Sequence, residues 1–179
     1  QRGLYLPKLS THIALRLRRA AEELLGIEEQ TESVVPAVFQ WEAEQLVDNC
    51  QTDMALPGTQ RRAQFGPHWS NNQQLFWRPN KMGSELRVHL PVALEGRFQV
   101  TIWATQAPDY GTIELQVGSK PLGDPIDFFA SRVSQPREVT LGEFDLTVED
   151  VEMTIRITGK RPESVGYYVG IDKLRFVRV

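Results

Sequence analysis

Hydrophobic and polar residues alternate over most of this chain, from Val38 to the C-terminus. The clearest runs are ELRVHLPV, GRFQVTIWAT, TIELQVG and VEMTIRIT. Successive side chains of a strand point to opposite faces, so a period of two gives each strand one apolar face. Such a face is stable only when it packs against another layer. The alternation therefore predicts an all-β domain.

Turn-forming residues separate the alternating runs at regular intervals. Gly, Pro, Asn, Asp and Ser gather at 79–83, 95–96, 108–111, 118–119 and 159–166. Short strands with turn residues between them are typical of antiparallel sheets packed face to face. We expect residues 37–179 to form a jelly-roll β-sandwich of two antiparallel sheets.

The N-terminal segment has a different period. In STHIALRLRRAAEELLG, residues 10–26, Ile13, Leu17, Ala20 and Leu24 recur at helical spacing, and Gly26 follows as a stop signal. This pattern predicts an amphipathic helix, and the polar stretch after it reads as a connection. We therefore divide the chain into an N-terminal helix and linker, residues 1–36, and the β domain.

Composition excludes several classes of partner. The 179 residues carry a formal net charge of −3, whereas nucleic-acid binding draws on clustered Lys and Arg. No apolar run approaches the roughly 20 residues of a membrane-spanning helix. The single Cys50 cannot form an internal disulfide, and we expect a small buried thiol. Because the sequence begins with Gln1 and not Met, we expect an excised piece or a processed product rather than a whole gene product.

No familiar catalytic signature is present. The sequence lacks GxSxG, HExxH, a P-loop and GxGxxG. Its three histidines, His12, His68 and His89, fall in a predicted helix, a loop and a strand, so none is at metal-ligand spacing from another. We assign no catalytic residue and expect that the chain is not itself an enzyme.

Two carboxylates in VFQWEAEQLVDNC, Glu42 and Glu44, stand two residues apart in a predicted strand. Positions i and i+2 lie about 6.5 to 7 Å apart along a strand, so the pair could act as acid and base on a glycosidic bond. They could equally lie on a solvated face. A third reading is a cation site completed by Asp172 of the last predicted strand, since Ca²⁺ prefers hard oxygen ligands.

The order of several segments resembles a known family. WEAEQL, GPHWSNNQQL, EGRFQVTIWA, TIELQVGSKPLG and VGIDKLRF resemble, in that order, the galactose-binding-like β-sandwiches of carbohydrate-binding module families six and thirty-five. The resemblance covers about residues 37–179. GKRPESVGYYVGID is also similar to the end of accessory β-sandwiches attached to bacterial glycan-degrading enzymes.

The resemblance implies two kinds of site. Glu42, Glu44 and Asp172 match the residues that hold a structural calcium ion in these families. Sugars bind there at loops that combine aromatic faces with polar groups. The corresponding candidates in this sequence are Trp69, Ser70, Asn71, Asn72, Asp109, Tyr110 and Tyr167.

Two places depart from the family pattern. Gly170 stands where family-six members often carry a ligand-contacting Asn, and DFFASRVSQPRE has Phe128 and Phe129 in place of the usual loop Trp. The resemblance implies a noncatalytic carbohydrate-binding accessory domain of a larger bacterial glycan-active enzyme, extracytoplasmic or secreted. Its partners would be a polysaccharide and a neighbouring catalytic domain. The alternative is a structural or protein-interaction module without a glycan site.

Overall fold

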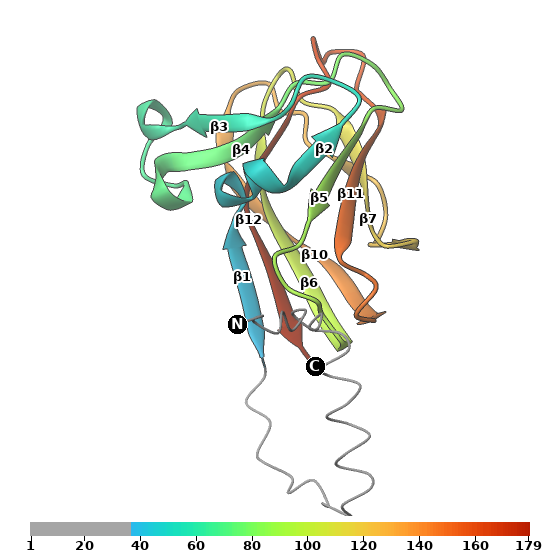
Figure 1. Ribbon diagram of the computed structural model, residues 1–179. Helices are drawn as coiled ribbons and strands as arrows, with labels where there is room; N and C mark the ends of the chain where they lie inside the picture. Colours follow the sequence, from blue (N-terminus) through green and yellow to red (C-terminus); the bar gives the residue numbers. More distant parts are fainter. Residues whose placement is uncertain (1–36) are drawn as a thin grey trace, which may run out of the picture. The chain divides into compact units, whose positions relative to one another are not determined.

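The computed structural model describes residues 37–179, which form two antiparallel sheets (Figure 1). The predicted helix at 10–26 and the linker up to residue 36 lie outside the described residues. The prediction of an all-β domain with two antiparallel sheets is confirmed.

The first sheet has its long strands in the order β10-β6-β12-β4-β3, with β1 also paired to β12. Its strands are β1 (Val38–Glu42), β3 (Gly58–Arg61), β4 (Gln73–Trp77), β6 (Gly96–Gln106), β10 (Ser134–Leu146) and β12 (Val169–Arg178). The second sheet has the order β2-β5-β11-β7-β8, with β9 also paired to β7. Its strands are β2 (Cys50–Thr52), β5 (Glu85–His89), β7 (Thr112–Val117), β8 (Lys120–Pro121), β9 (Ile126–Asp127) and β11 (Glu152–Gly159).

From β4 to β7 the chain changes sheet with each strand, and β10, β11 and β12 do the same. The connections between these consecutive strands therefore run from one sheet to the other. Two-residue alternation sets the core: every second residue of β7 is buried, and Met153, Ile155 and Ile157 of β11 are fully buried. These side chains join Val100 and Ile102 of the first sheet in one apolar cluster. The jelly-roll description remains a prediction.

The strand that begins the domain is shorter than predicted. β1 ends at Glu42, and Ala43–Asn49 form the 3-10 helix η1. Ala43 and Leu46, three residues apart, are both buried, which matches the period of a 3-10 helix and not that of a strand. The prediction that Glu42 and Glu44 share one strand face was therefore wrong.

Pairing of the first and last strands is confirmed. β1 lies antiparallel to β12, with Glu42 opposite Lys173 (Figure 1). The pairing of β12 with β6 shifts register between Ile171 and Lys173, at Asp172. Cys50 is buried as expected, and burial, together with the charge of Asp48, raises the pKa of its thiol to about 11.

Candidate functional site

Asp172 is a buried carboxylate at the register shift of β12. Its exposed fraction is 1%, and its Oδ1 accepts a hydrogen bond of 2.8 Å from the backbone amide of Ser70. Burial, with a smaller contribution from the negative charges of Glu42 and Glu44, raises the pKa of Asp172 to about 6. The structure thus brings the three predicted metal ligands within electrostatic reach of one another, although they come from β1, η1 and β12.

The two glutamates retain unused acceptors. Oε2 of Glu42 and Oε2 of Glu44 are buried without a hydrogen-bond partner, while Oε1 of Glu44 accepts from Asn71 Nδ2 at 3.1 Å. A buried carboxylate oxygen is costly unless a donor or cation compensates it. Hard oxygen atoms with excess negative charge are the kind of donor that Ca²⁺ prefers.

Side chains alone do not complete such a site. Across residues 37–179, no three His, Cys, Asp or Glu side chains are placed so that they could hold a metal ion. Because Ca²⁺ takes six to eight oxygen ligands, an ion bound here would draw others from backbone carbonyls or water. Such an ion would neutralise the negative charges of Glu42, Glu44 and Asp172.

The loop predicted to bind sugar is fixed to these carboxylates. The backbone amide of Ser70 donates to Asp172, and the side-chain amide of Asn71 donates to Glu44. Together with Asn72, the next residue in the chain, three of the predicted sugar contacts therefore lie beside the predicted metal ligands. Asn71 and Asn72 have φ of 51° and 53°, a left-handed conformation that Asn adopts more readily than most residues. Both side chains are exposed.

Trp69 and Tyr110 belong to a buried polar network over the first sheet. Trp69 Nε1 donates to Thr105 Oγ1 at 2.7 Å, and Thr105 Oγ1 donates to Gln74 Oε1. Gln74 Nε2 in turn donates to Gln60 Oε1 and to the Tyr110 hydroxyl, at 2.7 and 3.1 Å. The exposed fractions of Trp69 and Tyr110 are 4% and 2%, so both rings support the loops from beneath.

Gly170 lies against this network. A Cβ atom at this position would stand 2.4 Å from the Tyr110 hydroxyl and 2.5 Å from Gln74 Nε2. Tyr110 and Gln74 therefore fill the space into which a larger residue would extend.

The remaining predicted contacts, Asp109 and Tyr167, are half-buried in two loops that touch. The backbone oxygen of Asp109 accepts from Tyr168 N at 2.9 Å, and Lys160 Nζ lies 5.3 Å from the centre of the Tyr167 ring. These residues are partly accessible, unlike Trp69 and Tyr110.

A hollow that the sequence predictions missed lies between β9 and β10. Its volume is about 490 Å³, and its polar and aromatic lining includes Gln106, Asp124, Asp127, Phe129, Arg137 and Arg161. Arg161 forms an ion pair with Asp127 and lies 5.7 Å from the centre of the Phe129 ring. Asp127 also accepts from Phe129 N at 2.9 Å. The one sequence signal was the unusual segment DFFASRVSQPRE, which supplies Phe129 and Arg137.

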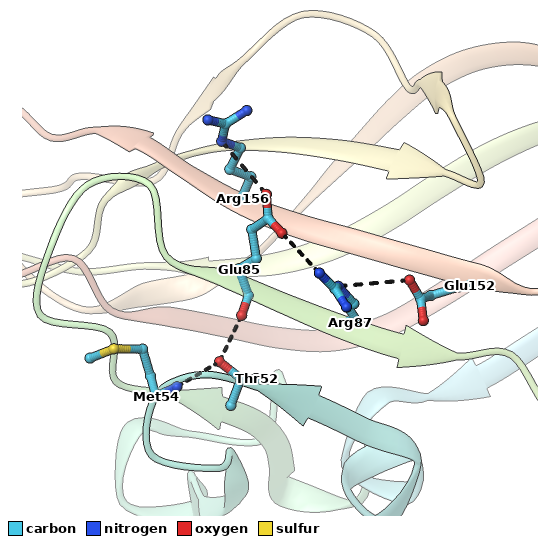
Figure 2. Close-up of polar contacts among 6 residues, drawn as sticks. All are labelled: Thr52, Met54, Glu85, Arg87, Glu152 and Arg156. Atoms are coloured by element: carbon cyan, nitrogen blue, oxygen red, sulfur yellow. Dashed lines mark hydrogen bonds and ion pairs between the residues drawn. The ribbon is translucent and has the colours of Figure 1, made fainter.

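A second hollow, of about 410 Å³, lies beside β2 and β5 and is lined by Thr52, Asp53, Glu85 and Arg87 among others. Figure 2 shows that Glu85 and Arg87 of this lining are in ion pairs: Glu85 contacts Arg87 at 3.6 Å and Arg156 at 3.9 Å, and Arg87 also reaches Glu152 at 3.9 Å. Thr52 Oγ1 donates to the Glu85 backbone oxygen at 2.6 Å. This hollow lacks an aromatic ring among its lining residues.

Solved structures share the fold. A Paenibacillus xanthan lyase has a TM-score of 0.66 and 21% identity, over 83% of this chain and 14% of the lyase chain. The insecticidal crystal protein Cry2Aa has a TM-score of 0.51 and 12% identity, over 79% of this chain and 21% of its own. A Podospora anserina GH26-CBM35 β-(1,4)-mannanase is more distant, with a TM-score of 0.45 and 15% identity, over 79% of this chain and 28% of the enzyme.

The chain therefore spans a small part of each of these proteins, and identities this low show a shared fold alone. No protein-family model matches the chain, and no curated protein matches it significantly. Among residues 37–179 there is no helix with the length and hydropathy of a membrane span.

Proposed function

We propose that this chain is a noncatalytic carbohydrate-binding accessory domain of a larger, extracytoplasmic bacterial glycan-active enzyme. The observation that carries the proposal is the hollow between β9 and β10, where the ring of Phe129 lies beside two guanidinium groups, two carboxylates and the Gln106 amide. Sugars present C–H faces that pack on aromatic rings and hydroxyls that need hydrogen bonds, so a sugar site combines both kinds of group.

The hollow has room for a short stretch of glycan. Its volume of about 490 Å³ falls within the roughly 300–1,000 Å³ of small-molecule sites. Arg137 is exposed at its wall and lies 5.6 Å from the centre of the Phe128 ring. Asp109, Tyr167 and the loop Ser70–Asn72 form a second proposed contact area, with Trp69 and Tyr110 as its buried supports.

The noncatalytic role follows from how the carboxylates are engaged. Asp127 is held by Arg161 and by the amide of Phe129, so each of its two carboxylate oxygens already has a hydrogen-bond donor. Glu42, Glu44 and Asp172 are proposed as calcium ligands, away from the hollow. By binding a polysaccharide, the domain would raise the effective concentration of substrate around a linked catalytic domain. A Paenibacillus xanthan lyase has a region of this fold that makes up 14% of its chain, so the fold occurs as one part of an enzyme named for a polysaccharide.

The test is affinity electrophoresis of the full chain in gels containing plant and bacterial polysaccharides. We expect at least one polymer to retard the wild type, and Phe129→Ala and Arg137→Gln to reduce that retardation. Arg78→Gln, an exposed arginine between β4 and β5, serves as the matched control. Circular dichroism checks that each variant is folded.

One observation favours the alternative, a structural or protein-interaction module. Trp69 and Tyr110 are buried, and Tyr110 fills the space beside Gly170. If no polysaccharide retards the wild type, or if Phe129→Ala and Arg137→Gln behave like Arg78→Gln, sugar binding at the hollow is wrong. The domain is then better explained as a structural or protein-interaction module.

A further inference from the structure

The charged side chains that line the hollow between β9 and β10 balance one another. They are two arginines, Arg137 and Arg161, and two aspartates, Asp124 and Asp127, and no Lys, Glu or His is among the lining residues. The two positive and two negative charges cancel. The hollow therefore carries no excess charge that would attract an ionic ligand.

One arginine and one aspartate of this set neutralise each other. Arg161 Nε donates to Oδ2 of Asp127, and the backbone amide of Phe129 donates to Oδ1 of the same carboxylate at 2.9 Å. Both oxygens of Asp127 are thus engaged. Arg161 Cζ also lies 5.7 Å from the centre of the Phe129 ring. This ion pair is a fixed part of the wall beside the aromatic ring.

The other arginine and aspartate are both exposed, and they do not contact each other. Within residues 37–179, neither Asp124 nor Arg137 makes a hydrogen bond or an ion pair. Arg137 lies over the buried ring of Phe128, with Cζ 5.6 Å from the ring centre. Asp124 comes from the segment between β8 and β9, whereas Arg137 belongs to β10. Two different segments thus present to the hollow one negatively charged acceptor and one positively charged donor.

This combination suits hydroxyl groups better than carboxylates. A hydroxyl both donates and accepts hydrogen bonds, so the hydroxyls of a sugar could accept from Arg137 and donate to Asp124. Both contacts would be charge-assisted, which makes them stronger than neutral hydrogen bonds. An ionised carboxylate only accepts. Bound at Arg137, it would share the hollow with Asp124, and like charges brought together in a binding site oppose binding.

We propose that this hollow selects uncharged polysaccharides against acidic ones, with Arg137 donating to hydroxyl groups of the bound glycan and Asp124 accepting from them. The half-buried side chains of Phe129 and Val139, also in the lining, supply apolar contact for the C–H groups of the sugar. This inference rests on the proposed function, to which it adds the class of glycan and a role for Asp124 in specificity.

The test begins with affinity electrophoresis of the full chain in neutral polysaccharides and in two acidic ones, polygalacturonate and alginate. The neutral polymer that retards the chain most is then compared with its own carboxymethyl and hydroxyethyl derivatives, at equal substitution and one ionic strength. Both derivatives alter hydroxyl groups, but only the carboxymethyl one adds negative charge. We expect it to bind at least about ten-fold more weakly than the hydroxyethyl one, because Asp124 repels it.

Variants of Asp124 assign this preference to one side chain. Asp124→Asn keeps an oxygen acceptor but no charge, so it should remove most of the difference between the two derivatives. Asp145→Asn is the matched control, because Asp145 is exposed on β10, pairs with Arg97 at 3.3 Å and does not line the hollow. It makes the same change in net charge and should leave the difference as it is.

Asp124→Ala removes the acceptor altogether. We expect it to weaken binding of the unmodified neutral polymer by about ten-fold or more, as for the loss of a charge-assisted hydrogen bond. Because Asp124 is exposed, its replacement should leave the domain folded, and circular dichroism checks this for each variant. A folded Asp124→Ala variant that binds the neutral polymer as tightly as the wild type would show that Asp124 does not contact the glycan.

The outcomes distinguish this inference from the proposed function. If only acidic polysaccharides retard the wild type, or if the carboxymethyl and hydroxyethyl derivatives bind equally well, the inference fails and the proposed function stands. The same holds if Asp124→Asn keeps as strong a preference as Asp145→Asn. If no polysaccharide of either class retards the wild type, the proposed function fails and this inference fails with it.

Discussion

Gly170 of β12 lies against a buried hydrogen-bond network. Any Cβ there would meet Tyr110 and Gln74, both members of the buried network that ends at Trp69. We expect Gly170→Ala to lower the free energy of unfolding by about 1–3 kcal/mol, the range for overpacking in a well-packed site. Urea denaturation followed by tryptophan fluorescence measures this change.

The matched control is Gly58→Ala in β3, where a Cβ meets nothing within 4 Å. It should leave stability within about 0.5 kcal/mol or raise it slightly. Removing the hydroxyl in a Tyr110→Phe, Gly170→Ala double variant should recover part of the loss, because the two sites are in contact. Equal stabilities of Gly170→Ala and Gly58→Ala would show that the network has room.

At the scale of elements, three carboxylates join β1, η1 and β12, and their charges repel. The folded state raises the pKa of Asp172 to about 6, from 3.8 for an unperturbed group. The folded protein therefore binds more protons than the unfolded chain between about pH 4 and 6. The stability that protonated Asp172 contributes is fully present below about pH 4 and is lost as the pH rises through 6.

We expect the free energy of unfolding in the presence of EDTA to show this loss between pH 4 and 6, measured by urea denaturation. Ca²⁺ should restore stability at pH 7, because it neutralises the carboxylates that repel one another. Asp172→Asn keeps an acceptor for Ser70 N but cannot ionise, so it should show neither the pH-dependent loss nor the calcium effect. A calcium effect that persists in Asp172→Asn would remove this residue from the proposed cation site.

The same elements show what the sequence could predict. Alternation located the strands because each has one face on the core, as Ile113, Leu115 and Val117 of β7 illustrate. It failed at Glu44, where Ala43 and Leu46 follow a three-residue period that a short window of strand-forming residues conceals. The pairing of β1 with β12 was predictable because a β-sandwich commonly pairs its first and last strands. The same rule predicts that Glu42 and Asp172, far apart in the sequence, lie near each other.

Burial of loop side chains could not be predicted in the same way. Trp69 lies among Gly, Pro and Asn, which suggests an exposed loop. The loop instead folds back over the first sheet, and the Trp69 indole donates a hydrogen bond to Thr105, 36 residues away. The hollow beside Phe129 and the burial of Arg62 also depend on contacts between distant segments. The residues next to each of these positions in the sequence do not indicate such contacts.

At the scale of the whole domain, the two sheets share one apolar cluster, so neither has a core of its own. The tryptophans of residues 37–179 all belong to the first sheet or to the loop over it: Trp41, Trp69, Trp77 and Trp103. Tryptophan fluorescence therefore reports on the first sheet, while a substitution can be placed in the second. This separation tests whether the two sheets unfold as one unit.

Ile155 of β11 is fully buried in the second sheet. We expect Ile155→Ala to lower stability by about 2–5 kcal/mol. Because the core is shared, the whole loss should appear in the urea midpoint of tryptophan fluorescence. Thr154→Ala, next to it and half-buried on the other face, should move that midpoint far less. If Ile155→Ala leaves the fluorescence transition in place while amide exchange of β11 and β7 accelerates, the sheets unfold separately, and each must then hold a core that the shared cluster does not explain.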